Sequence, residues 1–165
     1  AILGLMVYTF ARVGALVAMN VADYYPQGKR WWVRLHEKGG KRHDVPAHHK
    51  PEEYLDAYLD AAALRDQRRG PLFRTAKGRT GLLKAGRVTR RDVYEMVRRR
   101  ARDAGLATAI GCHTFRATGI INYLTHRGTP EKAQQLANHE SAGTAKLYDR
   151  RDDELSLGEA ERITI

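Results

Sequence analysis

The sequence predicts a mainly α-helical domain with a small antiparallel β-sheet near its start, which is an α+β fold. Most of the chain places apolar residues at helical spacing, between Thr, Pro and Gly residues that begin or end helices. Between residues 21 and 46, by contrast, aromatic and branched residues lie around two glycine-bearing turns. The 165 residues, 42% of them hydrophobic, are enough for one domain with a buried core.

The first third is predicted to run from helix to sheet to helix. A helix or helix pair covers residues 2–18, and another helix opens at Pro51, where proline precedes two acids. The predicted strands are residues 21–25, 30–36 and 42–46, joined by turns at residues 26–28 and 38–41. Because the second turn is Lys-Gly-Gly-Lys, it suits a tight hairpin.

The rest of the chain is predicted to be helical after one irregular stretch. Residues 65–87 are rich in turn formers and basic residues, with a short extended piece at residues 72–73. Thr89 then caps a helix that ends near Gly105, and Thr129 and Pro130 begin another. The predicted helices are residues 90–104, 114–125, 130–137, 142–148 and 152–163.

Charge and cysteine content restrict the functional class. The net charge of +10 is concentrated in the middle third, which predicts an anionic partner, with nucleic acid first. The single cysteine, Cys112, excludes an internal disulfide and favours a reducing, intracellular setting. The opening run AILGLMV is too short to span a bilayer, so no membrane partner is expected. Ala1 begins a helical pattern without a cap, which favours a chain whose upstream part was removed.

Polar residues recur at predicted helix ends between residues 112 and 150. His113 and Arg116 are three residues apart, so at a helix N-terminus they point toward one spot that suits a phosphate. His139 follows a helix, and Tyr148 comes nine residues later. Taken singly, each has a structural explanation, as a cap, a surface residue or half-buried packing. Their joint spacing favours a site built around an anion.

These residues carry a resemblance to a known family. HTFRATG followed by LANHESAGTAKLYDR is similar to the C-terminal signature of the tyrosine recombinases, the phage integrase family. That signature is H-x-x-R, then a His or Trp, then a Tyr nine residues further on. TFARVGA matches the family's earlier arginine helix at Arg12, and EKGGKRHDVP matches its G-K-G-x-K-x-R-x-V-P hairpin at Lys38. The resemblance runs from about Tyr8 to Tyr148 and implies the tyrosine recombinase catalytic-domain fold.

The resemblance implies a role for each matched residue. Arg12 and Arg116 would grip the scissile phosphate, with a third hydrogen bond from His139. Tyr148 would attack the phosphorus, His113 would accept its proton, and Lys38 would protonate the leaving 5′ oxygen. The product would be a 3′-phosphotyrosine link that a second 5′-hydroxyl reopens, without metal or ATP. Neither a phosphate-binding glycine loop nor a familiar zinc spacing occurs in the sequence; the group His43, Asp44, His48 and His49 matches no known ligand pattern.

Two residues near Arg12 depart from the family pattern. Ala15 stands where the family often has an acid, three residues after the arginine, and Phe10 stands where it often has glycine. Both positions usually support the arginine. Ala137 and Asn138 replace the family's Leu-Gly pair before His139, which is a milder departure.

Double-stranded DNA is the expected partner. Phosphate contacts are predicted for the basic residues Lys41, Arg42, Arg74, Lys77, Arg79, Arg87, Arg90 and Arg91. Residues 98–102 form either another contact surface or a solvated helix face. By resemblance, residues 1–150 are the catalytic domain, the N-terminal core-binding domain is absent, and residues 151–165 form a tail that docks on the same or another protomer. The full-length protein would form a synaptic tetramer on DNA and be a cytoplasmic, nucleoid-associated protein of bacterial or phage origin. The alternatives are a type IB topoisomerase-like enzyme and an inactive DNA-binding module.

Overall fold

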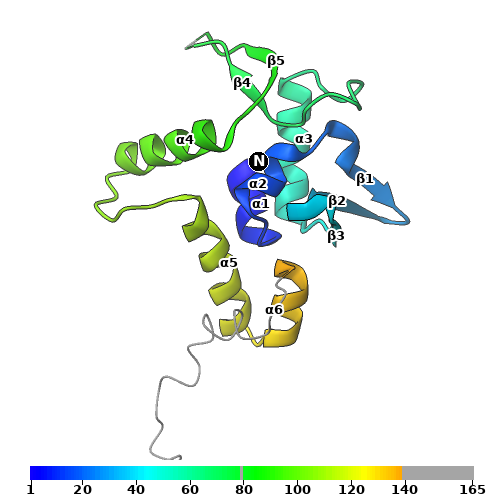
Figure 1. Ribbon diagram of the computed structural model, residues 1–165, viewed down its shortest axis with the longest axis vertical. Helices are drawn as coiled ribbons and strands as arrows, with labels where there is room; N and C mark the ends of the chain where they lie inside the picture. The colour runs from blue at the N-terminus through cyan, green and yellow to red at the C-terminus, as the bar shows by residue number, and fades with distance from the viewer. Residues whose placement is uncertain (79, 139–165) are drawn as a thin grey trace, which may run out of the picture. The chain divides into compact units, whose positions relative to one another are not determined.

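The computed structural model describes residues 1–78 and 80–138. It divides into two compact units, residues 1–119 and 120–165. The elements of the first unit, seen in Figure 1, are α1 (Ile2–Tyr8), α2 (Val13–Ala18), β1 (Tyr24–Gln27), β2 (Arg30–His36), β3 (Arg42–Pro46), α3 (His49–Ala61), β4 (Arg74–Ala76), β5 (Leu83–Arg87) and α4 (Arg90–Asp103). Helix α5 (Cys112–Thr125) begins in the first unit and ends in the second, which also holds α6 (Pro130–Ala137). The predicted mainly helical fold with a small antiparallel β-sheet near its start is confirmed.

The three-stranded sheet has the order β1-β2-β3, and both pairings are antiparallel. Val33, at its centre, lies opposite Tyr24 on one side and Val45 on the other, and all three are buried. The strands predicted at residues 30–36 and 42–46 have the observed bounds. Gly39 and Gly40 in the connecting turn have φ of 77° and 75°, which a residue without Cβ adopts at no steric cost.

The prediction of a strand at residues 21–25 was wrong for its first three residues. Val21–Asp23 forms a short 3₁₀ turn, and β1 runs from Tyr24 to Gln27 through the residues predicted to turn. The carboxylate of Asp23 accepts a hydrogen bond from the backbone N–H of Asn20 at 2.8 Å, which stabilises the turn. Pro26 fits the strand because β1 lies at the edge of the sheet, where no further ladder donor is required.

Strands β4 and β5 form a second hairpin that the sequence did not predict. Arg74 pairs with Arg87 and Ala76 with Leu83, whereas the predicted extended piece, Leu72-Phe73, is buried just before β4. All five residues of β5 are exposed, so the strand lacks the apolar alternation by which a half-buried strand is recognised.

Helices α1, α2 and α3 enclose the core of the first unit with the inner face of the sheet. Leu5, Leu16, Leu55 and Leu59 are buried at their contacts. Helix α3 begins at His49, two residues before the predicted start, because His48 provides the cap. Its ring nitrogen accepts a hydrogen bond from the backbone N–H of Lys50 at 3.2 Å.

Helix α4 begins at the predicted cap. The Thr89 hydroxyl accepts from the Asp92 N–H at 3.1 Å, and the Asp92 carboxylate accepts from the Thr89 N–H at 2.8 Å. Hydrogen bonds from the Thr89 side chain and backbone hold the pKa of Asp92 below its ordinary value. Val93 and Val97 are buried, and Gly105, with φ of 69°, follows the helix end.

The described part of the second unit holds the end of α5, a turn and α6. Gly128 separates the helices, and the Thr129 hydroxyl accepts from the Lys132 N–H at 3.3 Å to cap α6. Pro130 occupies its first turn, so the helix predicted at residues 130–137 is confirmed. The helices predicted at residues 142–148 and 152–163 lie outside the described residues. No helix within the described ranges is long and apolar enough to cross a membrane.

Arg87 has a structural role at the end of α2. Its guanidinium donates to the carbonyls of Val17 and Met19 at 2.7 and 2.6 Å and to the Asn20 side chain at 2.6 Å.

Arg87→Ala is expected to lower the free energy of unfolding by about 1–2 kcal/mol, because carbonyls at the end of a short helix lose charged donors. Urea denaturation measures this change. Arg91→Ala is the matched control and should leave the midpoint unchanged, since Arg91 is exposed and donates only to Glu95 among the contacts described. Equal stability of Arg87→Ala and the control would contradict the assignment.

Candidate active site

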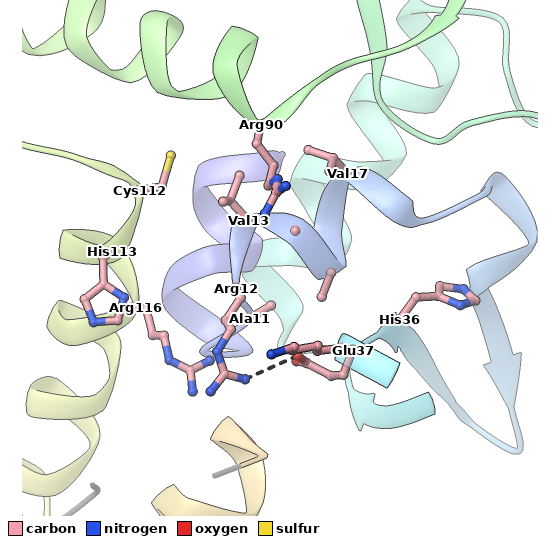
Figure 2. Close-up of a pocket in the computed structure, with 13 residues that line it drawn as sticks. Ala11, Arg12, Val13, Val17, His36, Glu37, Arg90, Cys112, His113 and Arg116 are labelled. Carbon is pink, nitrogen blue, oxygen red and sulfur yellow. Dashed lines mark hydrogen bonds and ion pairs between the residues drawn. The ribbon is translucent and has the colours of Figure 1, made fainter. Parts of the chain in front are cut away.

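A large cavity in the first unit lies among the starts of α2 and α5 and the β2–β3 hairpin. Its volume is roughly 750 Å³. The polar side chains that line it are Arg12, His36, Glu37, Lys38, Arg90, His113 and Arg116. All of these except Lys38 are labelled in Figure 2. Six of these seven side chains are basic or imidazole groups, so the cavity is suited to an anion.

Arg12 stands at the start of α2. Its backbone is extended, and its carbonyl accepts from the N–H of Leu16 at 3.2 Å, so the helix begins directly after it. Half of the side chain is exposed, and Nη1 donates to Glu37 at 3.2 Å (dashed line in Figure 2). The helix start thus holds a guanidinium whose other donors remain open to the cavity.

Arg116 lies in the second turn of α5 and is only 2% exposed. It is the largest fully buried side chain among the described residues, and its Nη1 donates to the backbone carbonyl of Phe10. Phe10 has φ of 54°, so the chain between α1 and α2 turns its carbonyl toward α5 through an unfavoured conformation. Since an arginine stays charged even when buried, this position places a fixed cation at the cavity wall.

Gly119, one turn after Arg116, explains how α5 approaches so closely. A Cβ at residue 119 would lie 2.0 Å from the Val7 carbonyl oxygen and 2.9 Å from the Phe10 ring. Only glycine permits this contact, so the Gly in the sequence HTFRATG fixes the distance between Arg116 and the chain that carries Arg12.

The structure brings four of the six predicted catalytic residues to one cavity. Arg12 and Arg116 direct their guanidinium groups into the same space in Figure 2, and His113 lies one turn before Arg116 on α5. Lys38 reaches the cavity from the exposed turn between β2 and β3. His139 and Tyr148 lie outside the described residues.

Two polar lining residues, Glu37 and His36, were not predicted as part of any site, and a third, Arg90, was predicted in another role. Glu37 pairs with Arg12, and His36 Nε2 lies 2.8 Å from the buried Asp23 carboxylate. Arg90 was predicted only as a DNA contact, but its side chain also lines the cavity. The sequence contained a signal for Glu37, because this residue replaces the first glycine of the family's hairpin motif. None existed for His36, whose placement depends on strand pairing.

Cys112 also lines the cavity but is not suited to be a nucleophile. Burial raises the pKa of its thiol, so the thiolate is disfavoured at neutral pH. In the described part of the chain, no group of three or more His, Cys, Asp or Glu side chains is placed to hold a metal ion.

The predicted DNA-binding residues fall into three groups. Lys41, Arg42, Lys77, Arg90 and Arg91 are exposed, as are Arg98, Arg99, Arg100 and Arg102 on α4. Arg74 and Arg87 are engaged locally, since Arg74 donates to Gln67 Oε1 at 2.6 Å and Arg87 donates at the end of α2. Arg79 lies outside the described residues. Exposed residues are therefore the better candidates for phosphate contacts.

Two arginines directed at one cavity, on a helical domain with a β-hairpin lysine, form a cationic site that is suited to an anion. The model of the Phage integrase family matches residues 1–154, and the chain belongs to that family. Tyrosine recombinase XerD of Mycobacterium leprae (strain TN) is 28% identical over 155 residues, which cover 90% of this chain and 46% of that protein. This chain therefore spans about half the length of the curated relatives it matches.

Solved structures show the same fold. XerH site-specific recombinase bound to a palindromic difH substrate, in a post-cleavage complex, matches with a TM-score of 0.74 and 22% identity over 98% of this chain and 44% of that one. The Tn1549 transposon integrase in complex with transposon right end DNA matches with a TM-score of 0.66 and 13% identity over 98% and 56%. The predicted tyrosine recombinase catalytic-domain fold is confirmed, and the relatives do not favour the topoisomerase alternative.

Proposed function

We propose that the protein cleaves and rejoins double-stranded DNA at specific sites, as the catalytic part of a tyrosine recombinase. The convergence of Arg12 and Arg116 on one cavity carries this proposal. A phosphodiester resists attack because its oxygens are anionic, and the transition state gathers further negative charge on them. Two fixed guanidinium groups offset both effects, since each can donate to two oxygens at once.

The remaining roles follow from the chemistry of the residue types. The Tyr148 oxygen attacks the phosphorus, the 5′ oxygen leaves, and a 3′-phosphotyrosine bond forms. His113 accepts the phenol proton, Lys38 donates a proton to the leaving oxygen, and His139 donates a hydrogen bond to a non-bridging oxygen. A 5′-hydroxyl from a partner strand then reverses the step. The phosphodiester energy stays in the covalent link, so the exchange requires neither metal nor ATP.

Double-stranded DNA as the partner is supported by the net charge of +10 and by the exposed basic residues of α4 and the β2–β3 turn. It is also supported by the integrase of the same fold whose structure contains transposon DNA. A synaptic tetramer of the full-length protein on DNA remains a prediction, as does a cytoplasmic, nucleoid-associated location.

A trapping experiment with randomised DNA tests the activity and identifies the target sequence at the same time. The protein is incubated with a library of randomised duplexes that carry a nick, in EDTA and without ATP. When cleavage occurs beside the nick, the short fragment with its 5′-hydroxyl diffuses away and the covalent adduct accumulates. SDS-resistant adducts that enrich one sequence are the expected result. Absence of any adduct would contradict the proposal, and relaxation of supercoiled DNA that lacks the enriched sequence would favour a topoisomerase.

The role of Lys38 is tested on the enriched duplex. Lys38→Ala is expected to slow cleavage by roughly 10²–10⁴-fold, since a general acid contributes about that much. A 5′-phosphorothiolate substrate should restore the rate, because a thiolate leaves without protonation. The exposed Lys41, three residues along the same hairpin, provides the control. Lys41→Ala should change the cleavage rates of the two substrates by the same factor. Slow cleavage of both substrates by Lys38→Ala would assign the lysine another role.

A further inference from the structure

Glu37 is the one carboxylate among the residues described as lining the cavity. Its Oε2 lies 3.2 Å from Arg12 Nη1, and its side chain is only 7% exposed, against 50% for Arg12. The backbone also holds it in place, because the Glu37 N–H donates to the Lys41 carbonyl at 2.8 Å and closes the hairpin turn. The Glu37 carboxylate is therefore buried and held in place, whereas half of the Arg12 side chain that it contacts is exposed.

This ion pair differs from the surface pairs of the same protein. Both partners are well exposed in Lys50–Glu53, at 45% and 63%, and in Arg91–Glu95, at 86% and 59%. Such pairs contribute little, because water competes for both charges. A carboxylate withdrawn from water is costly unless a cation compensates it, so the Glu37 charge and the Arg12 position depend on each other.

We propose that Glu37 is a positioning residue that orients Arg12 toward the scissile phosphate, an inference that rests on the proposed function. The contact uses Nη1 and leaves the remaining N–H donors of the guanidinium for phosphate oxygens. A guanidinium anchored at one nitrogen samples fewer orientations, so less entropy is lost when it binds a phosphate in a bidentate arrangement.

The sequence explains why an acid is needed at this position. Ala15, three residues after Arg12, is 3% exposed, lines the same cavity and supplies no charge there. In the hairpin, Glu37 replaces the first glycine of the motif G-K-G-x-K. The carboxylate that usually supports the arginine from its own helix is thus provided here by the end of the β2–β3 hairpin.

The position of the acid in the hairpin also links two parts of the site. Glu37 precedes Lys38 directly, so the ion pair connects the turn that carries the lysine to the start of α2. One contact therefore holds the arginine to the turn that carries Lys38, whereas an acid at residue 15 would support the arginine alone.

Two measurements with Glu37→Gln test the inference, with Glu53→Gln as a control that makes the same charge change on an exposed pair. The first is NMR of the Arg12 guanidinium protons, assigned with Arg12→Lys, and it requires no catalysis. Glu37→Gln should shift these resonances and speed their exchange with water, whereas Glu53→Gln should leave them unchanged. Unchanged Arg12 resonances in Glu37→Gln would overturn the inference, whether or not the protein cleaves DNA.

The second measurement is single-turnover cleavage of the enriched duplex. At saturating DNA, Glu37→Gln should cleave roughly 10- to 100-fold more slowly, since a misplaced group costs about this much. Its affinity for DNA should be equal or higher, because one negative charge is removed. Adding Ala15→Glu to Glu37→Gln should recover part of the rate. Faster cleavage by Glu37→Gln would show that Glu37 competes with the phosphate and would overturn the inference. An absent adduct with wild-type protein refutes the proposed function alone, and the NMR result then decides the positioning role.

Discussion

Replacement of Tyr148 by phenylalanine is expected to abolish the covalent adduct with DNA entirely. The substitution removes one oxygen atom, which is the proposed nucleophile, and keeps the aromatic ring. Without it, no phosphotyrosine bond can form, and the other residues of the site cannot substitute. The measurement is the SDS-resistant adduct on the enriched, nicked duplex, compared with non-covalent binding of the same duplex, which should be retained.

Tyr94→Phe is the matched control for this result. Tyr94 is 49% exposed on α4, so loss of its hydroxyl should change neither folding nor adduct yield. An adduct that persists in Tyr148→Phe would show that another residue attacks the phosphorus. Failure of Tyr148→Phe to bind DNA would also contradict the account, because the phenol oxygen is not assigned a binding role.

Replacement of Arg116 by lysine is expected to slow cleavage by about 10²–10³-fold, the usual effect of removing one preorganised donor from a charged transition state. Lysine keeps the positive charge but replaces a planar fork with a single ammonium, so it cannot bind both the Phe10 carbonyl and two phosphate oxygens in a fixed plane. The measurement is the single-turnover cleavage rate at saturating DNA.

Thermal unfolding and a control variant separate this effect from misfolding. Arg116→Lys keeps the charge but weakens the contact with the buried Phe10 carbonyl, so its unfolding midpoint should fall modestly while the protein still unfolds in one cooperative transition. Arg30→Lys at the exposed start of β2, a residue with no assigned role in the site or in DNA binding, should cleave at the wild-type rate. A wild-type cleavage rate in a folded Arg116→Lys protein would mean that the buried guanidinium supports only the fold.

Elements with strong local signals were predictable from the sequence. The Lys-Gly-Gly-Lys turn, the caps at Thr89 and Thr129 and the helix ends at Gly105 and Gly128 depend on residues within a few positions of each other. The sheet strands β2 and β3 and helices α4 and α6 accordingly lie within one residue of their predicted bounds.

Features that depend on distant contacts were not predictable. The exposed strand β5 is held by pairing with β4, and Arg87 is directed to α2 by contacts across about 70 residues. The Glu37–Arg12 pair joins a hairpin to a helix start, and neither segment alone reveals it. The convergence of Arg12, Lys38, His113 and Arg116 was expected only through the family resemblance, because residues separated by up to 104 positions cannot be brought together by local patterns.

The identity of the DNA-linked residue tests the central claim most directly. The adduct formed on the enriched duplex is digested with trypsin and nuclease and analysed by mass spectrometry. Cleavage after Lys146 and Arg150 should release residues 147–150 with a nucleotide attached to Tyr148 through its 3′-phosphate. A nucleotide on any other residue, or one joined through its 5′-phosphate, would contradict the account.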